Sequence, residues 1–327
     1  MNRSDDPELS IIVVNWNTRD MTIACLESLL RETQSTSFEV LLIDNGSHDG
    51  SADAIAARFP QVRLLRESVN HGFAKANNIA AEAARGSRLL LLNSDTVVLD
   101  RAVDRLADFA GRTPQARIWG GRTVYGDGSL NIGSAWGRQT VWSAFCFASG
   151  LSLLLSRFSL FDPEAMRGWD RGSEREVDIV SGCFLMIDRS LWDELGGFDQ
   201  DFFMYAEEAD LCLRAKARGA RPRVSPEATI VHYGGASATS NSQAVRRVLR
   251  AKVALARKHM GPLSARTVHL LFVFAAALRR GAYALLSAVT GKGGEQAKVW
   301  DAVWRDRRTW TAPAAPAGVS AAGRQAG

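Results

Sequence analysis

A run of four leucines, Leu89 to Leu92, constrains the fold of this chain more than any other segment. Consecutive apolar residues between polar ones predict a strand buried on both faces, as in the middle of a parallel sheet. The run ends in Asn93, Ser94 and Asp95. Ligands of open α/β sheets bind beyond the carboxyl ends of strands, and a carboxylate there suits a divalent cation that holds a diphosphate. The alternative is that Asp95 only caps the next turn.

Strand patterns alternate with helical patterns through the first third of the chain. We expect strands at 9–14, 38–43, 62–65 and 89–92, and helices near 20–31, 52–58 and 73–84. This alternation is typical of βαβ units and predicts a parallel sheet. Further along, we expect a helix at 100–110 capped by Asp100, a strand over 177–187, a helix within 202–218 and a last strand at 228–231 that ends in His232.

The composition is that of an ordinary globular protein. The 327 residues are 46% hydrophobic and 23% charged, which allows a sizeable core without disulfides. The four scattered cysteines include no Cys-x-x-Cys pair, which argues against a zinc site and fits a reducing compartment. The first eight residues lack the design of a signal peptide. We therefore expect a cytoplasmic protein, and from its modest net charge of +5 we expect no nucleic-acid partner.

The character of the chain changes beyond residue 240. Basic residues lie among apolar ones at helical spacing: Arg246, Arg247, Arg250, Lys252, Arg257 and Lys258. Two apolar pieces, 268–278 and 281–289, are separated by Arg279 and Arg280, and each is too short to cross a bilayer of ~30 Å. Such a tail fits a position on an anionic membrane surface, and the alternative is a helical pair packed on the rest of the protein or on another subunit.

These observations divide the chain into four parts. They are a flexible N-terminus (1–8), an α/β domain (9–240), a basic amphipathic helical region (241–311) and a disordered tail (312–327) rich in Ala, Pro and Gly.

Seven short motifs occur in order along about residues 9 to 260. They are Val-Val-Asn-Trp-Asn (13–17), Leu-Leu-Ile-Asp-Asn-Gly-Ser-His-Asp-Gly-Ser (41–51), Asn-His-Gly-Phe-Ala-Lys-Ala-Asn-Asn (70–78), Leu-Leu-Asn-Ser-Asp (91–95), Gly-Gly-Phe-Asp (196–199), Phe-Met-Tyr-Ala-Glu-Glu-Ala-Asp-Leu-Cys-Leu-Arg (203–214) and Val-His-Tyr-Gly-Gly-Ala-Ser (231–237). Together they resemble the motifs of family 2 inverting glycosyltransferases, most of all the bacterial rhamnosyltransferase-like branch. Their joint occurrence is far more specific than any one of them. The resemblance implies a GT-A-like fold, a Rossmann-like and mostly parallel sheet flanked by helices, followed by a C-terminal helical appendage.

The resemblance implies a metal site at two strand ends. Asp95 matches the metal-binding Asp of the family, and His232 is a second ligand or a diphosphate contact; the alternative for His232 is an ordinary surface or core histidine. A carboxylate beside an imidazole suits Mn²⁺ at least as well as Mg²⁺. Asn93 departs from the Asp-x-Asp form of the family, which leaves one carboxylate fewer around the cation.

The resemblance also implies donor-binding residues. Asp44 resembles the residue that accepts the imide N–H of a uracil or thymine ring, which would select pyrimidine donors; its alternative is a turn or helix-capping role. The other candidates for contact with the donor are Val14, Asn15, Asn17, Asn70, Lys75, Asn77, Asn93, Ser94 and Asp95.

The catalytic base is expected in the pair Glu207 and Glu208. An inverting transfer needs one carboxylate that takes the proton of the acceptor hydroxyl. The family normally has Glu-Asp here with the second residue as base, so Glu208 is the expected base and Glu207 a supporting residue, although Glu208 carries one methylene more. Asp210 and Arg214 are four residues apart and are expected to form an ion pair on a helix.

These expectations define one function and two alternatives. We expect metal-assisted transfer of a sugar, L-rhamnose from dTDP-rhamnose or a hexose from a UDP-sugar, onto a polysaccharide or lipid-linked oligosaccharide. The enzyme would lie peripherally at the inner face of the plasma membrane, and an oligomer is compatible with the sequence. The alternatives are a nucleotidyltransferase, which would release pyrophosphate, and an inactive subunit that binds glycan or membrane. No Ser/His or Cys/His triad pattern is visible, and the glycine loops lack the dinucleotide and P-loop forms.

Overall fold

The computed structural model of the protein describes residues 6–234 and 241–312. Most of the expected flexible N-terminus and of the expected disordered tail, and the end of the seventh motif, lie outside the described residues.

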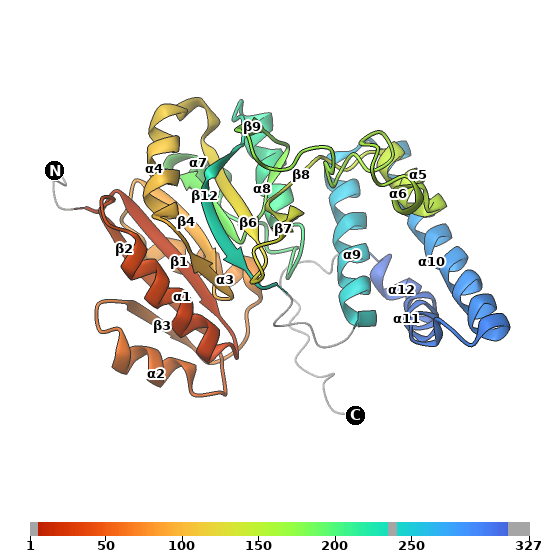
Figure 1. Ribbon diagram of the computed structural model, residues 1–327, viewed down its shortest axis with the longest axis horizontal. Helices are drawn as coiled ribbons and strands as arrows, with labels where there is room; N and C mark the ends of the chain where they lie inside the picture. Colours follow the sequence, from red (N-terminus) through yellow and green to blue (C-terminus); the bar gives the residue numbers. More distant parts are fainter. Residues whose placement is uncertain (1–5, 235–240, 313–327) are drawn as a thin grey trace.

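The domain that forms the first part of the chain is built on a ten-stranded sheet with the principal order β3-β2-β1-β4-β11-β6-β12-β5 (Figure 1). The main strands are β1 (Leu9–Asn15), β2 (Phe38–Asn45), β3 (Arg63–Glu67), β4 (Arg88–Asn93), β5 (Thr96–Val98), β6 (Ile118–Val124), β11 (Phe184–Asp188) and β12 (Arg223–His232). Strands β1 to β4 pair in parallel, β11 runs antiparallel to both of its neighbours, and β12 is again parallel to β6. The predicted GT-A-like fold, a mostly parallel sheet flanked by helices, is confirmed.

Helices cover both faces of the sheet (Figure 1). The helices on one face are α1 (Arg19–Glu32), α2 (Ser51–Arg58) and α4 (Ala102–Arg112); those on the other are α3 (Phe73–Ala83), α7 (Arg189–Leu195) and α8 (Glu207–Ala217). In the leucine strand β4, Leu89 and Leu91 belong to one core, and Leu90 and Leu92 belong to the other. All four side chains are buried, which confirms the predicted central strand.

The strand predicted over 177–187 is wrong, because this segment belongs to two sheets. Strand β10 (Ile179–Val180) pairs with β8 (Ala135–Trp136) in a separate two-stranded sheet, and only β11 joins the main sheet. The break between them, 181–183, lines the cavity described below. A continuous apolar pattern could not show this change of partner.

The helix predicted at 100–110 begins at Ala102 in α4, and the prediction that Asp100 caps it is wrong. Asp100 has φ 42, in the left-handed region, and lies outside the helix. The buried carboxylate of Asp104 in the first turn instead accepts backbone N–H groups of Gln34 (2.9 Å) and Thr36 (2.9 Å). These bonds tie α4 to the loop that follows α1.

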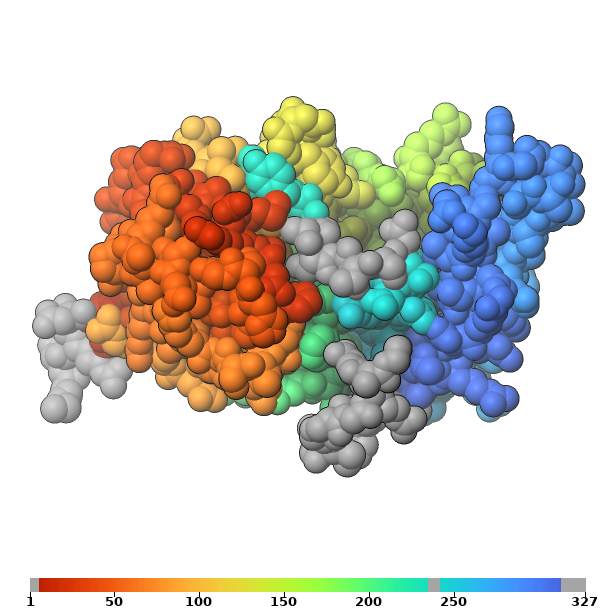
Figure 2. Space-filling view, turned by 90° about the horizontal axis from the view of Figure 1, so that it is seen from below, coloured from red at the N-terminus to blue at the C-terminus, as the bar shows by residue number. Residues whose placement is uncertain are grey.

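The C-terminal helices form a third core at the end of the molecule opposite β1 to β3 (Figures 1 and 2). They are α9 (Asn241–His259), α10 (Pro262–Thr290), α11 (Gly294–Arg305) and α12 (Arg307–Trp310), and they pack with α5 (Val141–Ser149), which α6 (Leu151–Leu154) follows. The expected interruption of α10 is wrong, since it is one helix of 29 residues. Arg279 donates hydrogen bonds to the backbone oxygens of Ala275 and Phe147, and Arg280 donates to the carboxylate of Asp301 (2.9 Å).

Helix α10 differs from the helices of the sheet domain in its exposure. Among the described residues it is the one helix long and apolar enough to cross a membrane by length and composition. Only 17% of its most apolar 18-residue window is buried in the protein. The two short apolar pieces of the sequence therefore combine into one largely uncovered apolar helix.

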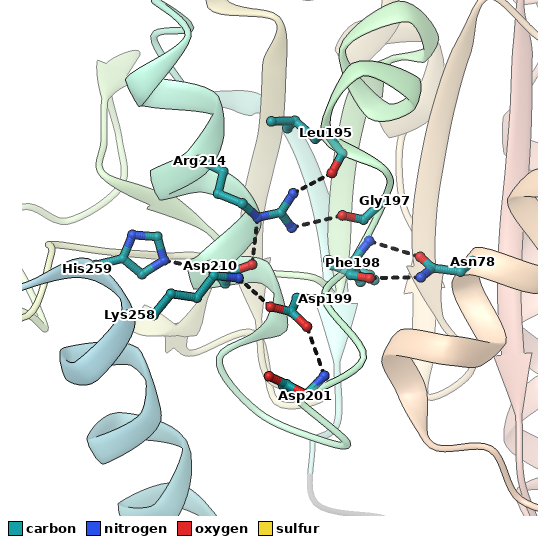
Figure 3. A network of polar contacts seen from close by, with 10 residues as sticks. All are labelled: Asn78, Leu195, Gly197, Phe198, Asp199, Asp201, Asp210, Arg214, Lys258 and His259. Atoms are coloured by element: carbon teal, nitrogen blue, oxygen red, sulfur yellow. Dashed lines mark hydrogen bonds and ion pairs between the residues drawn. The ribbon is translucent and has the colours of Figure 1, made fainter. Parts of the chain in front are cut away.

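A buried carboxylate, Asp210, joins the sheet domain to the C-terminal helices (Figure 3). It accepts hydrogen bonds from Arg214 Nε of its own helix α8 (2.7 Å) and from His259 Nε2 of α9 (2.7 Å), and Lys258 Nζ of α9 lies 2.7 Å away. Burial alone would raise the pKa of Asp210, but the hydrogen bonds from His259 and Lys258 lower it to about 2. The predicted Asp210–Arg214 pair is confirmed, and it is one part of a larger network.

The same network fixes the turn before α8. Arg214 also donates to the backbone oxygens of Leu195 (2.9 Å) and Gly197 (2.8 Å). Asn78 of α3 binds both the backbone N–H and the backbone oxygen of Phe198 (2.9 and 2.8 Å; Figure 3). The turn predicted at 195–199 is therefore held between α3 and α8.

A buried guanidinium, Arg171, joins the stretch 132–135 to its own loop, 165–171. Its nitrogens donate to five backbone oxygens at 2.7 to 3.2 Å, those of Ile132, Ala135, Ala165, Met166 and Trp169. Arg171 also stacks on the Trp169 ring, and the exposed Arg175 stacks on the same ring. The loop 165–171 contains no helix or strand, so its backbone carbonyls are satisfied by the guanidinium of Arg171 in place of a regular hydrogen-bond ladder.

Replacement of Arg171 by Met should destabilise the protein by about 3 kcal/mol or more, since buried carbonyls would lose charged donors. The matched control is Arg175→Met, which removes an exposed cation from the same tryptophan ring and should cost less than about 1 kcal/mol. Urea unfolding measures both free energies. Equal costs for the two variants would contradict the structural role of Arg171.

Replacement of Asp210 by Asn should remove a pH-dependent part of the stability. Because the pKa of Asp210 is about 2 in the folded protein, below the usual 3.8, its ionised form stabilises the fold above about pH 4, and this contribution is lost as the pH falls toward 2. We expect a loss of about 2 kcal/mol at pH 7 and a smaller loss at pH 3. The exposed Asp108, changed to Asn, is the control for urea unfolding at both pH values. A pH-independent loss would argue against the charge of Asp210 as the cause.

Candidate functional site

A cavity of about 440 Å³ lies beyond the carboxyl ends of β1 and β4. Of the residues predicted to form the site, those that line it are Val14, Asn70, Asn93, Ser94, Asp95, Glu207, Glu208 and His232. They come from five segments that are far apart in the chain. The ends of β1, β4 and β12 thus meet at this cavity, whereas Asn15, Asn17 and Asp44, which were also expected there, do not line it.

Asp95 and His232 meet because β5 pairs with β12, with Thr96 opposite His232. Asp95 Oδ1 lies 3.3 Å from His232 Nε2, and the Asn93 amide nitrogen lies 3.4 Å from the same ring atom. Burial lowers the pKa of His232, but the hydrogen bond to Asp95, the contact with Cys183 and the charge of Asp95 outweigh burial and raise this pKa to about 10. Asp95 Oδ1 and His232 Nε2 thus lie close enough together to be ligands of one cation.

The donor set around Asp95 fits a cation that is held together with a diphosphate. Magnesium is typically bound through one or two carboxylates and substrate phosphates, with several waters retained. Among the described residues no group of three or more His, Cys, Asp and Glu side chains is arranged to hold a metal alone. The buried Asn93 Oδ1 has no hydrogen-bond partner in the described part of the chain, so it is a further oxygen available beside Asp95 and His232.

Asn15 and Asp44 lie beside each other under the cavity without lining it. They are paired across β1 and β2, and Asn15 Nδ2 donates to Asp44 Oδ1 (2.7 Å). Asp44 Oδ2 accepts the backbone N–H of Ser47 (3.2 Å), and Asn17 accepts the N–H of His48 (2.8 Å). These bonds hold the loops after β1 and β2 together.

Lys75 and Asn77 are not brought to the cavity. Lys75 is exposed on α3, and Asn77 is buried and donates to the Phe73 backbone oxygen one turn earlier (2.9 Å). Asn70 lines the cavity and accepts a hydrogen bond from Asn45 (3.0 Å), a neighbour that the motif analysis did not single out.

Glu207 and Glu208 begin α8 at the wall of the cavity. One oxygen of each carboxylate, Oε2, is buried and has no hydrogen-bond partner among the described residues. Burial raises the pKa of both groups, and the charge of Glu208 raises the pKa of Glu207 further. Tyr205 and Ala206 just before them have φ 72 and 69, and such strained backbone clusters at functional sites. A partly desolvated carboxylate of raised pKa is suited to general-base chemistry.

Several lining residues were missed by the sequence reasoning: Trp16, Thr18, Asn45, Asn131, Trp136 and Tyr205. Trp16, Asn45 and Tyr205 stand inside recognised motifs, so their position next to predicted site residues was an available signal. Asn131 and Trp136 come from two-residue strands, β7 (Leu130–Asn131) and β8, which are too short to give a sequence pattern. Phe73, interpreted as core, also lines the cavity.

A second cavity of about 640 Å³ adjoins the first. Trp136, Tyr205 and Glu208 line both. The rest of its wall comes from α5, α6, the segment 161–167 and the helices α8, α9 and α10. The expected base therefore stands between a polar cavity at the sheet and a more apolar one at the C-terminal helices.

Similarity to a solved structure agrees with this architecture. A mannosyltransferase from Pyrobaculum calidifontis, in complex with GDP-mannose and Mn²⁺, matches 94% of this chain and 84% of its own, with a TM-score of 0.56 and 19% identity. At this identity the similarity shows the fold alone.

Two curated relatives match most of this chain. The N-acetylglucosaminyl-diphospho-decaprenol L-rhamnosyltransferase of Mycobacterium tuberculosis (strain ATCC 25618 / H37Rv) is 30% identical over 244 residues, 69% of this chain and 76% of that protein. The O-antigen biosynthesis protein RfbC of Myxococcus xanthus is 29% identical over 234 residues, 71% of this chain but only 18% of RfbC. The chain thus spans less than a fifth of RfbC.

A shorter match, 39% identical over 61 residues, links the chain to the rhamnosyltransferase WbbL of Escherichia coli (strain K12), with 19% of this chain and 23% of that protein covered.

The family model described as "Glycosyl transferase family 2" matches residues 10–195, more than half of the chain. With the 30% identity to the mycobacterial enzyme, this match shows that the chain belongs to glycosyl transferase family 2 and is a glycosyltransferase, as its seven motifs predicted.

Proposed function

We propose that this glycosyltransferase moves L-rhamnose from dTDP-rhamnose, or a hexose from a UDP-sugar, onto a polysaccharide or lipid-linked oligosaccharide with inversion at the anomeric carbon. The observation that carries the proposal is the buried Glu208 Oε2, which has no hydrogen-bond partner among the described residues and belongs to the same cavity as the Asp95–His232 pair. The names of two relatives, both rhamnosyltransferases, support the choice of sugar.

Asp95 and His232 would hold Mn²⁺ or Mg²⁺, with Asn93 beside them. When bound, the cation supplies Lewis-acid stabilisation of the negative charge that grows on the departing diphosphate. The Mn²⁺ in the complex of the archaeal mannosyltransferase supports this type of cofactor.

Glu208 would take the proton of the acceptor hydroxyl as that oxygen attacks the sugar from the side opposite the diphosphate. Its buried surroundings raise its pKa and thereby make it a stronger base than an exposed glutamate. Glu207 lies beside it, and the negative charge of ionised Glu208 raises the pKa of Glu207, which favours a protonated Glu207 next to the base.

The donor's base and ribose would lie near Val14, Asn15, Asn17 and Asp44. Asp44 already receives one hydrogen bond on each carboxylate oxygen, from Asn15 and Ser47, and each oxygen has a further lone pair for a pyrimidine N–H. The proposed contacts of Lys75 and Asn77 with the donor have less support, since Lys75 is exposed on α3 and the Asn77 amide donates within that helix.

The uncovered side of α10 would rest on the inner face of the plasma membrane. Exposed apolar residues recur along it at intervals of four and seven, as on one side of a helix: Leu263, Leu270, Phe274, Leu278, Leu285 and Val289. Leu153 and Leu154 of α6 are also exposed. A stripe of exposed apolar side chains along one side of a helix is typical of helices that lie in a membrane interface.

The basic residues of α9 contribute less to this surface than the sequence suggested. Arg246 pairs with Asp306, Lys252 with Glu164, and Lys258 with Asp199. These cations hold α9 against the rest of the protein, so the apolar side of α10 carries the proposed membrane contact.

Replacement of Glu208 by Gln should reduce turnover by ~10²-fold or more, because the proton acceptor is lost while the shape is kept. The assay is Mn²⁺-dependent release of dTDP from dTDP-rhamnose, or of UDP from UDP-glucose, with a bacterial lipid extract as acceptor. Donor-induced thermal stabilisation should persist in the variant, since it reports binding alone.

The control variants for Glu208 are Glu207→Gln and Glu208→Asp. Glu207→Gln should lose less activity, and Glu208→Asp, which restores the usual acid of the family, should retain part of it. Unchanged turnover in Glu208→Gln would refute the assignment of the base. Absence of any donor-dependent nucleotide release by the native enzyme, with every donor tested, would refute the proposed transfer.

Replacement of Phe274 by Glu should weaken binding to phosphatidylethanolamine/phosphatidylglycerol vesicles several-fold, because a charge would enter the apolar side of α10. The control is Val69→Glu, at a residue of nearly equal exposure (55% against 54%) in the sheet domain. Sedimentation with vesicles measures both. Equal binding by the two variants would contradict the proposed membrane face.

A further inference from the structure

We propose that the second cavity binds the acceptor through an apolar chain and an adjoining phosphate group, with Arg279 as the residue that recognises the phosphate. This inference rests on the proposed function and specifies its acceptor as a lipid-linked phosphate whose sugar reaches Glu208.

The first argument is continuity with the proposed catalytic site. Glu208 and the rings of Trp136 and Tyr205 belong to the walls of both cavities. A molecule in the second cavity therefore reaches the base from the side of the C-terminal helices, while the donor cavity lies at the sheet. An inverting enzyme needs this arrangement, because the acceptor must approach the sugar from the side opposite the leaving group.

The second argument is the apolar wall. The cavity of about 640 Å³ is within the usual size of ligand pockets. Phe147 of α5, Phe161, and Val248, Ala251 and Leu255 of α9 contribute apolar surface to it. A chain of hydrocarbon would gain from contact with this wall in proportion to the area removed from water.

The rim of the cavity adds to this argument. Leu153 of α6 lines the cavity, and 77% of its surface is exposed. Its neighbour Leu154 is equally exposed, and both belong to the apolar surface that we propose to face the membrane. An apolar chain that leaves the cavity at Leu153 would pass to this surface without crossing a polar wall.

The third argument is a cation in the wall, Arg279, that has no ion-pair partner among the described residues. Of the cations in the wall, Lys252 pairs with Glu164 and Arg167 pairs with Asp162 (2.7 Å), and these carboxylates line the cavity too. Arg279 forms no ion pair with a carboxylate of the described residues. It is the cation here whose charge an arriving anion would neutralise.

The surroundings of Arg279 hold its guanidinium in place without neutralising it. It donates to the backbone oxygen of Phe147 (2.6 Å), and its carbon lies 4.2 Å from the centre of the Phe147 ring and 5.2 Å from that of Trp300. Burial lowers the pKa of Arg279, which shows the cost of leaving this charge uncompensated. A guanidinium has five N–H donors in a planar fork that matches a phosphate, and not all of them are used here.

The order of groups along the cavity identifies the ligand class. Glu208 marks the end where a hydroxyl must lie, Arg279 lines the second cavity but not the first, and Leu153 marks the apolar rim. A molecule that satisfies all three has a sugar, then an anionic link, then a hydrocarbon chain. A free oligosaccharide would leave both Arg279 and the apolar wall without partners.

The test is equilibrium dialysis of the whole chain with radiolabelled farnesyl diphosphate. This ligand has the apolar chain and the phosphates but no sugar. We expect saturable binding, weakened about tenfold or more by Arg279→Gln, in which the charge is lost. Arg279→Lys should retain part of the affinity. The matched control is Arg280→Gln at the next residue, which pairs with Asp301 outside the cavity and should bind as the native protein does. Ala251→Trp, which fills the cavity, should abolish binding.

Three results would overturn the inference: no saturable binding, equal effects of Arg279→Gln and Arg280→Gln, or competition by dodecylphosphocholine as strong as that by unlabelled farnesyl diphosphate. The last would assign the cavity to membrane phospholipid. Binding of dTDP and UDP with Mn²⁺ to the same variants separates this inference from the proposed function. Nucleotide binding without farnesyl diphosphate binding would reject only the acceptor site; the converse would reject the proposed donor site and leave the lipid site standing.

Discussion

The contact between the buried carboxylate of Asp210 and the cations around it determines how the two parts of this protein are placed. Arg214 belongs to the same helix, whereas Lys258 and His259 belong to α9. An ionised carboxylate without exposure is stable only when its charge is compensated, so α9 has to stay where these side chains reach. Because Glu208 begins the helix that carries Asp210, the interaction also sets the distance between the proposed base and the helices of the second cavity.

The fixed position of α8 explains how the site retains buried polar atoms without partners and strained backbone, which a folded protein normally avoids. The carboxylates of Glu207 and Glu208 each have a buried oxygen without a partner, and Tyr205 and Ala206 adopt left-handed backbone angles. Each feature costs free energy and persists only where the surroundings over-determine the conformation. Around α8, Asp210 and the carbonyl contacts of Arg214 supply this constraint. The groups left without partners are those that line the cavity, where a substrate can supply the missing hydrogen bonds.

The parts of the fold that sequence predicted are those governed by local pattern. The leucine strand and the alternation of strands and helices follow from periodicity, and the meeting of Asp95 with His232 follows from both lying at strand ends. The segment around Arg171 could not be predicted, because its order comes from bonds to carbonyls that no residue pattern encodes. The continuity of α10 was missed for the same reason: Arg279 interrupts the apolar pattern, but its partner Phe147 lies 132 residues away.

Helix α10 connects the two proposals about the acceptor and the membrane. One side of it, with Val268 and Phe272, is buried against the other C-terminal helices, while the side with Leu270 and Phe274 is exposed. Arg279 projects from the same helix into the second cavity. A membrane bound to the exposed side would therefore lie at a fixed position relative to the phosphate site and to Glu208. A lipid-linked acceptor could then reach the base while its chain stayed at the membrane, so that only its sugar and phosphate would need to leave the lipid surface.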